Sequence, residues 1–502
     1  MLTPEDISIL QQRGIPVSKI ESQLVRLQRG VPPILLVRPC RLTDGITQLS
    51  PENRSRYQAT FTKTLQAQRV SKFIPASGAA TRMFKDLLEF LQKQVSTSAV
   101  QQAWKYLEDF PFILDLKAYL STKGNNFQQL QQAQNMTTVF QSLLLTPGLG
   151  YADLPKALLC FHQYPESPRT SLEEHVQEAT YYSRNTPKHV NIHLTISPQH
   201  EKLINNKLRN IQGAMKKQGK AVDITVSLQK PSTDTIALDS HGQLFRSDDG
   251  KLLFRPGGHG ALLENLNDYK GDIIFISNID NVVPDHLKGF IIEWRMSLCG
   301  YLVELQESVF QHMYQLGSAQ HTVVDEAETF VQQHLHHQFP ASYDCLDIPD
   351  KAALLKQFLH RPIRVCGVVP NTGDPGGGPF WVLHTDGSQS RQIVEQSQVD
   401  PESESQQQIF ASATHFNPVD MVCGVRDYRG NPFNLLNFSD SDTSFISPKS
   451  YQGRTLKALE WPGLWNGGMA DWITLFVEIP RATFNPVKTF LDWLHPNHQP
   501  PA

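Results

Sequence analysis

The pattern of hydrophobic and polar positions predicts short strands that alternate with amphipathic helices along most of the chain. Runs rich in β-branched residues predict strands at Val70–Ile74, Asn191–Ile196 and Asp223–Gln229, in the apolar run that ends before Asn278, and at Arg364–Val369. Apolar residues at helical spacing predict helices at Ser171–Tyr182 and around Leu287–Leu305. This alternation is typical of an α/β fold with a mixed, mostly parallel sheet covered by helices.

The sequence also predicts helices near the N-terminus and a division of the chain into three regions. Near the N-terminus, Thr3 can cap a first helix that ends at Gly14, and Ser18 with Glu21 forms a capping box for a second helix that ends at Gly30. We therefore expect an N-terminal helical region over 1–68, an α/β core over 69–440 with helical insertions near 95–145, and a C-terminal region over 441–502 that completes or covers the core. Residues 400–408 are predicted as an exposed polar loop.

Composition narrows the class of protein. The 502 residues are 40% hydrophobic and 19% charged, with a net charge of −3, which gives no overall attraction to nucleic acid or to an anionic membrane. The six cysteines lie far apart without a Cys-x-x-Cys pair, which argues against a zinc knuckle or a disulfide framework. The first residues are acidic, and no apolar run approaches the ~20 residues that span a bilayer. We expect a cytoplasmic protein with no membrane or nucleic-acid partner.

A small-residue loop and a nearby carboxylate carry the clearest chemical signal. Gly258, His259 and Gly260 open a helical pattern, and backbone N–H groups at such a loop can hold a phosphate or a base edge. Asp280 follows an apolar strand in Asn-Ile-Asp-Asn, where a carboxylate can hold the divalent cation that phosphates require. The alternatives are an ordinary turn with an incidental histidine and an Asx-capped turn. The combination favours nucleotide chemistry.

An earlier strand, loop and helix have the same character. Ser77 and Gly78 lie in a small-residue turn before a helix predicted to begin at Thr81, and Arg82 and Lys85 follow where a phosphate on the helix N-terminus would need cations. The alternative is a turn that serves close packing only.

Other candidate residues give weaker signals. Lys156 follows Pro155, which can aim it, although an isolated Pro-Lys more often marks a solvated surface lysine. His334, His336 and His337 lack the acid of His-Glu-x-x-His, so we expect a polar, solvated helix face there. There is no Gly-x-Ser-x-Gly elbow and no Walker lysine motif.

Taken together and in order, four segments resemble the UDP-glucose and UDP-N-acetylhexosamine pyrophosphorylases. Pro75–Met83 is similar to the loop that holds the nucleotide, and Leu154–Ala157 to the segment whose lysine contacts phosphate. Pro256–Leu262 is similar to the segment near the uracil and the sugar, and Ile276–Asn281 to the strand end whose aspartate helps hold magnesium. A weaker match covers Gln392–Asp400. The whole chain also resembles an uncharacterised bacterial family, a domain of unknown function.

The resemblance implies a glycosyltransferase-A-like, Rossmann-like fold and a nucleotidyltransferase that joins a nucleoside triphosphate to a sugar 1-phosphate. It implies catalytic roles for Arg82, Lys85 and Lys156, and Mg²⁺ held by Asp280. The nucleotide- and sugar-binding residues that it implies are Ser77, Gly78, Thr81, Gly258, His259, Gly260, Glu395, and Lys449 or Lys457 as the late phosphate-binding lysine.

One departure from the family pattern leaves an alternative open. Ser77 and Ala80 stand where the pyrophosphorylases have glycine, and a Cβ can crowd a backbone that approaches phosphate closely. The alternative function is a nucleotide- or sugar-phosphate-binding protein without transfer activity, and a structural scaffold ranks third. The nucleobase, the sugar and the oligomeric state stay open.

Overall fold

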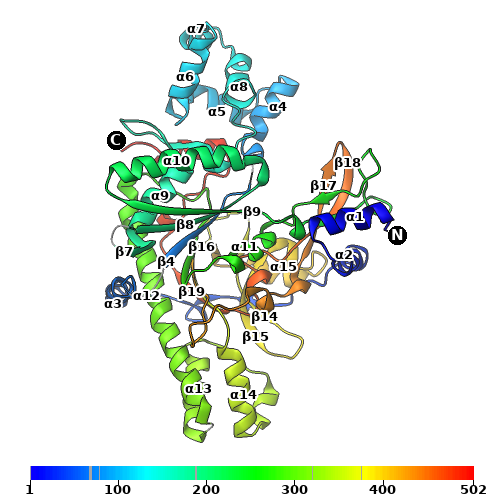
Figure 1. Cartoon of the computed structure of the whole chain (residues 1–502), viewed down its shortest axis with the longest axis vertical. Coiled ribbons are helices and arrows are strands. Elements are labelled where there is room, and N and C mark those ends of the chain that lie inside the picture. The colour runs from blue at the N-terminus through cyan, green and yellow to red at the C-terminus, as the bar shows by residue number, and fades with distance from the viewer. Residues whose placement is uncertain are drawn as a thin grey trace. The chain divides into compact units, whose positions relative to one another are not determined.

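The chain divides into two compact units that alternate along the sequence (Figure 1). The computed structural model describes residues 2–66, 70–78, 80–186, 189–318, 320–374 and 376–501. Unit 1 comprises Met1–Arg69, Gln229–Ile276 and Met296–Arg481, and unit 2 comprises Val70–Leu228, Ser277–Arg295 and Ala482–Ala502. The boundary expected at residue 68 falls outside the described residues, and the one expected at residue 440 stays a prediction.

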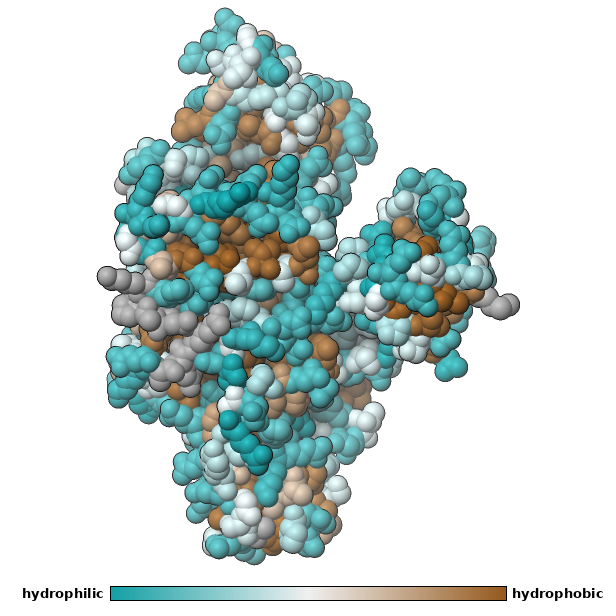
Figure 2. Space-filling model, in the orientation of Figure 1, coloured by the Kyte–Doolittle hydropathy of each residue, from teal (hydrophilic) through white to brown (hydrophobic). Residues whose placement is uncertain are grey.

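Unit 2 contains a sheet in which parallel pairing dominates. Its strands are β4 (Val70–Pro75), β7 (Arg184–Thr186), β8 (His189–Ile196) and β9 (Ala221–Leu228). β4 and β9 both pair with β8 in parallel, and β7 pairs with β8 antiparallel. Two helices, α9 (Ser171–Tyr182) and α10 (Glu201–Lys217), pack against these strands and share an apolar cluster with β8. Figure 2 shows polar side chains over α10 and a band of apolar side chains over β9.

A bundle of short helices completes unit 2. Its helices are α4 (Lys85–Lys93), α5 (Ser98–Lys105), α6 (Ile113–Thr122), α7 (Phe127–Gln132) and α8 (Met136–Leu144), and the short strands β5 (Cys160–His162) and β6 (Arg169–Thr170) follow. The stretch 95–145 is helical as expected, and its description as an insertion stays a prediction. Trp493, from the C-terminal segment, is fully buried against the rings of Phe84, Phe110, Phe112 and Phe161. The last residues of unit 2 therefore form part of the core of this bundle.

The central sheet of unit 1 is mixed. Its neighbouring strands are β2 (Arg41–Leu42), β3 (Gly45–Thr47), β19 (Ile473–Glu478), β13 (Ile363–Pro370), β16 (His415–Gly424) and β12 (Ile273–Ile276). The first four pair in parallel, whereas β16 runs antiparallel to both β13 and β12. Together, the strand pairings of unit 1 and unit 2 confirm the predicted mixed α/β class with a mostly parallel sheet. The strands between residues 36 and 47 were not predicted.

Two smaller antiparallel sheets also belong to unit 1. One contains β1 (Leu36–Pro39), β14 (Gly377–Leu383) and β15 (Gln389–Glu395); the other contains β11 (Phe254–Arg255), β10 (Thr235–Leu238), β18 (Arg454–Glu460) and β17 (Phe445–Tyr451). Helices α1 (Pro4–Arg13) and α2 (Val17–Arg29) share an apolar cluster with β10 and β18. The remaining helices are α3 (Pro51–Thr64), α11 (Leu263–Asp268), α12 (Asp285–Gln315), α13 (His321–Gln333), α14 (Ile348–Leu359) and α15 (Glu404–Ala411).

Two local predictions were wrong, and one was confirmed. Thr3 caps α1 and Gly14 ends it in the left-handed conformation, as expected. In contrast, α2 begins after Pro16 without a side-chain cap, so Ser18 and Glu21 lie inside the helix instead of forming a capping box. The polar stretch 400–408 is also not simply a loop, because α15 begins within it. Among the described residues, no helix combines the length and the apolar composition needed to cross a bilayer.

Candidate functional site

Lys156 and Asp280 form an ion pair in unit 2. Lys156 opens a short 3₁₀ turn directly after Pro155, and its Nζ donates to Asp280 Oδ2 at 2.8 Å and to the carbonyl oxygen of Val487 at 2.9 Å. The two charged side chains are only 17% and 19% exposed. The solvated surface lysine suggested by the local pattern is therefore wrong, and the lysine is positioned against the carboxylate that the sequence singles out as a metal ligand.

The turn that carries Asp280 is fixed through the neighbouring carbonyl group of Ile279. The hydroxyl of Ser171 donates to this oxygen, and His175 Nε2 lies 3.2 Å from it. Both side chains come from the first turns of α9 and are fully buried. Burial holds the pKa of His175 well below its ordinary value, so the ring is neutral and its Nε2–H can donate. The start of α9 thus holds the backbone next to the carboxylate.

The C-terminal segment of unit 2 holds the other side of the same turn. The N–H of Val487 donates to the carbonyl of Asp280 at 3.0 Å, and the N–H of Asn485 donates to Asn281 Oδ1 at 2.8 Å. Asn281 also donates weakly to the carbonyl of Thr483 at 3.5 Å. Residues 483–487 were not predicted from the sequence, because they belong to no periodic element and to no motif.

The first small-residue loop is bonded to the segment that leads to Lys156. The N–H of Ala80 donates to the carbonyl of Leu154 at 3.1 Å, and the hydroxyl of Thr81 donates to the carbonyl of Ala152 at 2.9 Å. Ala79, in the same loop, lies outside the described residues. These bonds join loop 75–81, residues 152–156 and Asp280 in one part of unit 2.

The two small residues of this loop face different surroundings. The side chain of Ala80 is fully buried in the apolar cluster of the helical bundle, so its methyl group is part of the core. Gly78 is exposed, and a Cβ placed there would meet no atom within 4 Å. The N–H groups of Ser77 and Gly78 donate to no partner among the described residues. The open part of the loop is therefore at residues 77 and 78, where a ligand has room.

The two cations that follow the loop are exposed. Lys85 has only a long contact with Glu89, at 3.9 Å, and Arg82 forms no hydrogen bond or ion pair within the described part of the chain. The helix expected to begin at Thr81 starts instead as a 3₁₀ turn over Thr81–Phe84, and α4 begins at Lys85. Both cations remain available to a phosphate.

In unit 1, the glycine loop packs against the chain at the end of β18. Gly258 has a φ of +74°, and a Cβ there would lie 2.8 Å from Glu460 Oε2. A Cβ on Gly260 would lie 2.3 Å from the carbonyl oxygen of Pro462. Close packing thus already requires both glycines. His259, between them, is exposed. It interacts electrostatically with Glu460 and therefore counts as part of the same polar cluster.

Glu460 links several of the residues implied by the resemblance. Lys449 Nζ lies 2.9 Å from Glu460 Oε1, and the hydroxyl of Ser447 donates to the same oxygen at 2.8 Å. Burial alone would raise the pKa of Glu460, but the hydrogen bonds from Lys449 and Ser447 outweigh it and hold the pKa below its ordinary value. Glu460 itself was missed, because no motif marks it.

Glu395, at the end of β15, belongs to this cluster. Burial and the negative charge of Glu460 raise the pKa of Glu395. Asn466 Nδ2 lies 3.5 Å from Glu395 Oε1 and 3.3 Å from Gln398 Oε1, whereas Asn466 Oδ1 is buried without a partner among the described residues. Glu460 thus brings together residues that are distant in the sequence: 258–259, 395 and 449, all in unit 1.

The register of β17 and β18 separates the two late lysines. Lys449 pairs with Leu456, so its side chain lies on the same sheet face as Leu456 and Glu460. Lys457 pairs with Pro448, and its side chain lies on the opposite face, where it is exposed. Only Lys449 joins the Glu460 cluster.

Comparison with known proteins identifies the family to which the chain belongs. A family model described as "Domain of unknown function (DUF4301)" matches residues 3–499. The chain belongs to this family. No curated protein matches the DUF4301 chain.

Two solved structures are similar to the DUF4301 chain. The uridine diphosphate N-acetylglucosamine pyrophosphorylase from Trypanosoma brucei, in complex with an inhibitor, has a TM-score of 0.48 and 11% identity. A mutant UDP-glucose pyrophosphorylase from Leishmania major has a TM-score of 0.46 and 12% identity. In each case the alignment covers 98% of the DUF4301 chain and 79% of the other chain.

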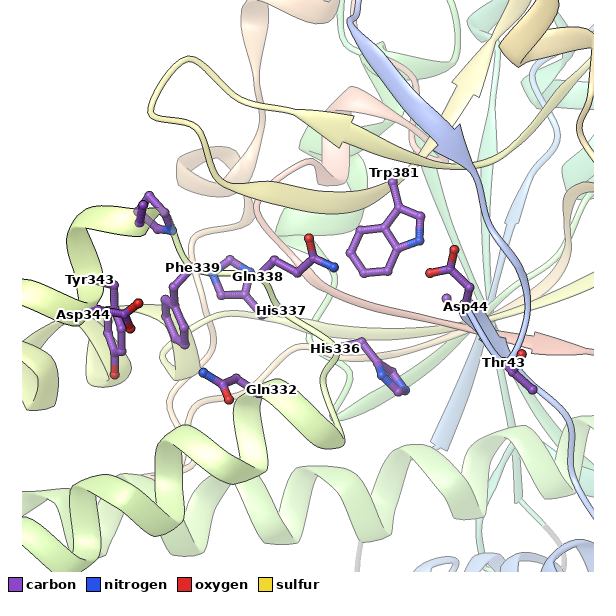
Figure 3. Close-up of a pocket in the computed structure, with 13 residues that line it drawn as sticks. Thr43, Asp44, Gln332, His336, His337, Gln338, Phe339, Tyr343, Asp344 and Trp381 are labelled. Atoms are coloured by element: carbon purple, nitrogen blue, oxygen red, sulfur yellow. The ribbon is translucent and has the colours of Figure 1, made fainter.

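The histidines after α13 were wrongly placed on a helix face. In the DUF4301 chain α13 ends at Gln333, and His336 and His337 lie in the segment that follows (Figure 3). The ring of His337 stacks on Phe358 with 4.1 Å between centroids. Burial lowers the pKa of both histidines to about 4. His334 alone is exposed as expected.

No ready-made metal centre accompanies Asp280. Within the described part of the DUF4301 chain, no group of three or more His, Cys, Asp and Glu side chains is arranged to hold a metal ion. A cation at Asp280 would therefore depend on oxygens that a ligand supplies.

Proposed function

We propose that this DUF4301 protein is a nucleotidyltransferase of the pyrophosphorylase type, which joins a nucleoside triphosphate and a sugar 1-phosphate into a nucleotide sugar and pyrophosphate. The observation that carries the proposal is the 2.8 Å pair between Lys156 and Asp280, joined by hydrogen bonds to the loop at residues 80–81. A phosphate-neutralising lysine, a metal-binding carboxylate and an open small-residue loop are the parts that such a reaction needs in one place. We extend the proposal to a glycosyltransferase-A-like fold and to a cytoplasmic location.

In this reaction a phosphate oxygen of the sugar 1-phosphate attacks the α-phosphorus of the triphosphate, and pyrophosphate leaves in line. The protein contributes positioning and charge neutralisation. Lys156 would neutralise charge at the reacting phosphate, and Arg82 and Lys85 would bind the remaining phosphates. The N–H groups of Ser77 and Gly78, which have no partner among the described residues, are suited to phosphate or base contacts.

Mg²⁺ fits the residues at this position. Asp280 Oδ1 forms no hydrogen bond with the described residues, while Oδ2 accepts from Lys156. Mg²⁺ is commonly held by one or two carboxylates together with phosphate oxygens and waters, so one aspartate suffices when the ligand brings phosphates. When bound, the ion would supply positive charge to the phosphates.

For unit 1 by itself, we propose that its polar cluster can bind a sugar or a base. Glu395 and His259 offer groups that can accept or donate hydrogen bonds to hydroxyls and base edges, and Lys449 supplies a cation. Asn466 Oδ1, buried without a partner among the described residues, is a further acceptor for a sugar hydroxyl.

The test is a thermal-shift panel of UTP, CTP, ATP, GTP and dTTP with and without Mg²⁺, followed by exchange of labelled pyrophosphate into the triphosphate that binds. We expect a Mg²⁺-dependent rise in melting temperature with one base, because a ligand of the native state stabilises it. We also expect exchange that needs the matching nucleotide sugar.

The Lys156→Gln variant should lower the exchange rate by about 10²–10³, as for other losses of a charge-stabilising group. Lys93→Gln, an exposed lysine of α4, is the control and should exchange normally. Nucleotide binding without exchange would support the binding protein instead. A flat panel up to several millimolar ligand would overturn both.

A further inference from the structure

A segment of unit 1 outside the proposed site forms the shared wall of two cavities. The segment that follows α13 supplies lining residues to both, namely His336, His337, Phe339 and Pro340, and each cavity has a volume of about 430 Å³. Figure 3 shows the first, with His336, Phe339, Tyr343 and Trp381 around it. The second, called the arginine cavity below, is lined by the same segment, the end of α14, the turn between β14 and β15, and residues 470–474.

A buried guanidinium without a counter-charge lines the arginine cavity. Arg391, on β15, is 5% exposed, and its Nη1 and Nη2 donate to the carbonyls of Gly45 at 3.2 Å and Leu335 at 2.6 Å. Among the described residues no carboxylate lies within 4.0 Å of it. Carbonyl oxygens satisfy hydrogen bonds but do not neutralise a charge, so a buried guanidinium with this environment is costly.

Two further arginines add to this excess of positive charge. Arg361 also lines the cavity, and its nearest carboxylate, Asp471, is 3.9 Å away. Arg364, on β13, is fully buried and donates to Thr474 Oγ1 and the carbonyl of Trp465, both at 2.7 Å, again with no carboxylate in the described part of the chain. Thr474 itself lines the cavity. Of the three guanidinium groups, that of Arg361 alone has a carboxylate within 4.0 Å in the described part of the chain, and this contact is 3.9 Å long.

The other polar groups of the cavity include hydrogen-bond donors beside the two carboxylates of Asp386 and Asp471. His336 and His337 are neutral at pH 7, since burial lowers their pKa to about 4, and each keeps one N–H. The indole N–H of Trp472 is buried without a partner among the described residues. The one nearby acid of the β14–β15 turn, Asp386, already accepts the N–H and the O–H of Ser388.

We propose that the arginine cavity binds a small anionic ligand with a phosphate or carboxylate group, and that Arg361 and Arg391 are its charge partners. The planar fork of arginine matches both anions, with two parallel N–H donors toward two oxygens. A bound anion would supply the counter-charge that Arg391 lacks among the described residues. The apolar side chains of Leu354 and Phe358 in the same wall would contact the rest of the ligand.

The test uses titration calorimetry on the full chain carrying Lys156→Gln, so that the proposed phosphate site of unit 2 is weakened. The probes are inorganic phosphate, pyrophosphate and citrate, each at constant ionic strength against chloride. We expect saturable binding of at least one probe, with tryptophan fluorescence changing over the same range because Trp472 lines the cavity.

Adding Arg361→Gln should weaken that binding about tenfold or more, the scale of one lost charge-assisted hydrogen bond. Arg361 is 27% exposed, so its replacement is expected to leave the fold intact, which circular dichroism checks. The matched control is Arg29→Gln, an exposed arginine at the end of α2, which should bind like the parent. Arg391→Lys provides a second variant, which keeps the positive charge but loses the two parallel N–H donors of the guanidinium group.

Two outcomes would overturn the proposal. One is no saturable binding of any probe up to 10 mM, on the order of a weak anion site. The other is equal affinity in the Arg361→Gln and Arg29→Gln chains. Anion binding that is present in the unmodified chain but absent from Lys156→Gln would place it at the proposed nucleotide site and would also count against the cavity. Because the readout is binding and not turnover, the result does not depend on the proposed transferase activity.

Discussion

Ala80 and Gly78 lie two residues apart in the same loop, but their side-chain positions have opposite surroundings. The methyl group of Ala80 is buried in the core of the helical bundle, whereas the position of a Cβ on Gly78 is empty. The extra methyl group at residue 80, relative to the glycine of the pyrophosphorylases, therefore packs inward and does not occupy the open part of the loop.

A pair of substitutions tests this difference. Ala80→Gly should lower the free energy of unfolding by about 1–2 kcal/mol, because it loses a buried methyl group and adds freedom to the unfolded chain. Gly78→Ala should leave that free energy within about 1 kcal/mol, since Gly78 has no strained φ and no neighbour within 4 Å. Chemical denaturation measures both. A loss of nucleotide binding in Gly78→Ala alone would then report ligand contact, whereas a destabilised Gly78→Ala would contradict the open loop.

The late lysines form a second matched pair. Lys449→Met should weaken binding of the sugar phosphate about tenfold or more, because it removes the cation next to Glu460. Lys457→Met should change it less than about twofold, because Lys457 is exposed on the other face of the β17–β18 hairpin. The KM for the sugar phosphate in the exchange assay provides the measurement. Equal effects of the two substitutions would show that the Glu460 cluster does not bind this substrate.

At the scale of elements, the turn Asn278–Asn281 depends on a segment that returns from the far end of the sequence. The amide of Asn281 accepts from the N–H of Asn485, and the side chain of Asn281 is 4% exposed. Without it, that N–H would be left unpaired in a buried place. The neighbouring Asn278 contributes its carbonyl oxygen to the turn, and no side-chain hydrogen bond to a described residue.

We therefore expect Asn281→Ala to lower the free energy of unfolding by about 1–3 kcal/mol, the cost of an unsatisfied buried group. Asn278→Ala, in the same tetrapeptide, should change it by less than about 0.5 kcal/mol. Urea denaturation compares the two. If both variants were equally stable, the bond between Asn281 and the C-terminal segment would not hold the turn.

Sequence patterns predicted elements where the signal is local, and failed where it is not. Ser171–Tyr182 was predicted with its observed bounds from helical periodicity, and in the structure a capping box at Thr170 begins this helix. The strands β1 and β3 were missed, since each is short and is defined by pairing with β14 and β19, more than three hundred positions later in the chain. The antiparallel β16 was also missed; it is defined by pairing with β12 and β13, which come earlier in the chain.

The residues of the candidate site also fall into those with a local sequence signal and those without one. Asp280 and the loop at residues 77–82 are recognisable from local motifs, and Lys156 from the resemblance. No local motif marks Glu460, Asn466 or residues 483–487. A single glutamate or asparagine forms no sequence pattern, and its role becomes visible only from its contacts in the fold. Candidate residues could thus be named from motifs, and the residues that hold them in place could not.

At the scale of the whole molecule, both units bury neutral histidines. Burial lowers the pKa of His193 in unit 2 and of His337 in unit 1 to about 4, and that of His498 to about 3, with His162 as a second cause. In the unfolded chain a histidine has a pKa near 6.5. Below that value the unfolded state binds protons that the folded state does not, so acid favours unfolding.

We expect the melting temperature to be constant above about pH 7 and to fall steadily from pH 6.5 toward pH 4. His193→Gln should reduce the fall, because burial is the one cause of its lowered pKa and glutamine does not titrate. Calorimetric scans at pH 7.5, 6.0 and 5.0 measure the change. A melting temperature that is flat or rises over this range would contradict the burial of neutral histidines.

The alternation of the two units along the sequence has a consequence for biosynthesis. Lys156 meets the carbonyl of Val487 across 331 positions of the chain, and Trp493 fills the core of a bundle whose helices are made early. At a translation rate of roughly 5–20 residues per second, a ribosome needs on the order of twenty seconds or more to add the missing segment. During that interval the aromatic core of unit 2 lacks its central ring. Nascent chains of this protein are therefore expected to need shielding by a chaperone until translation ends.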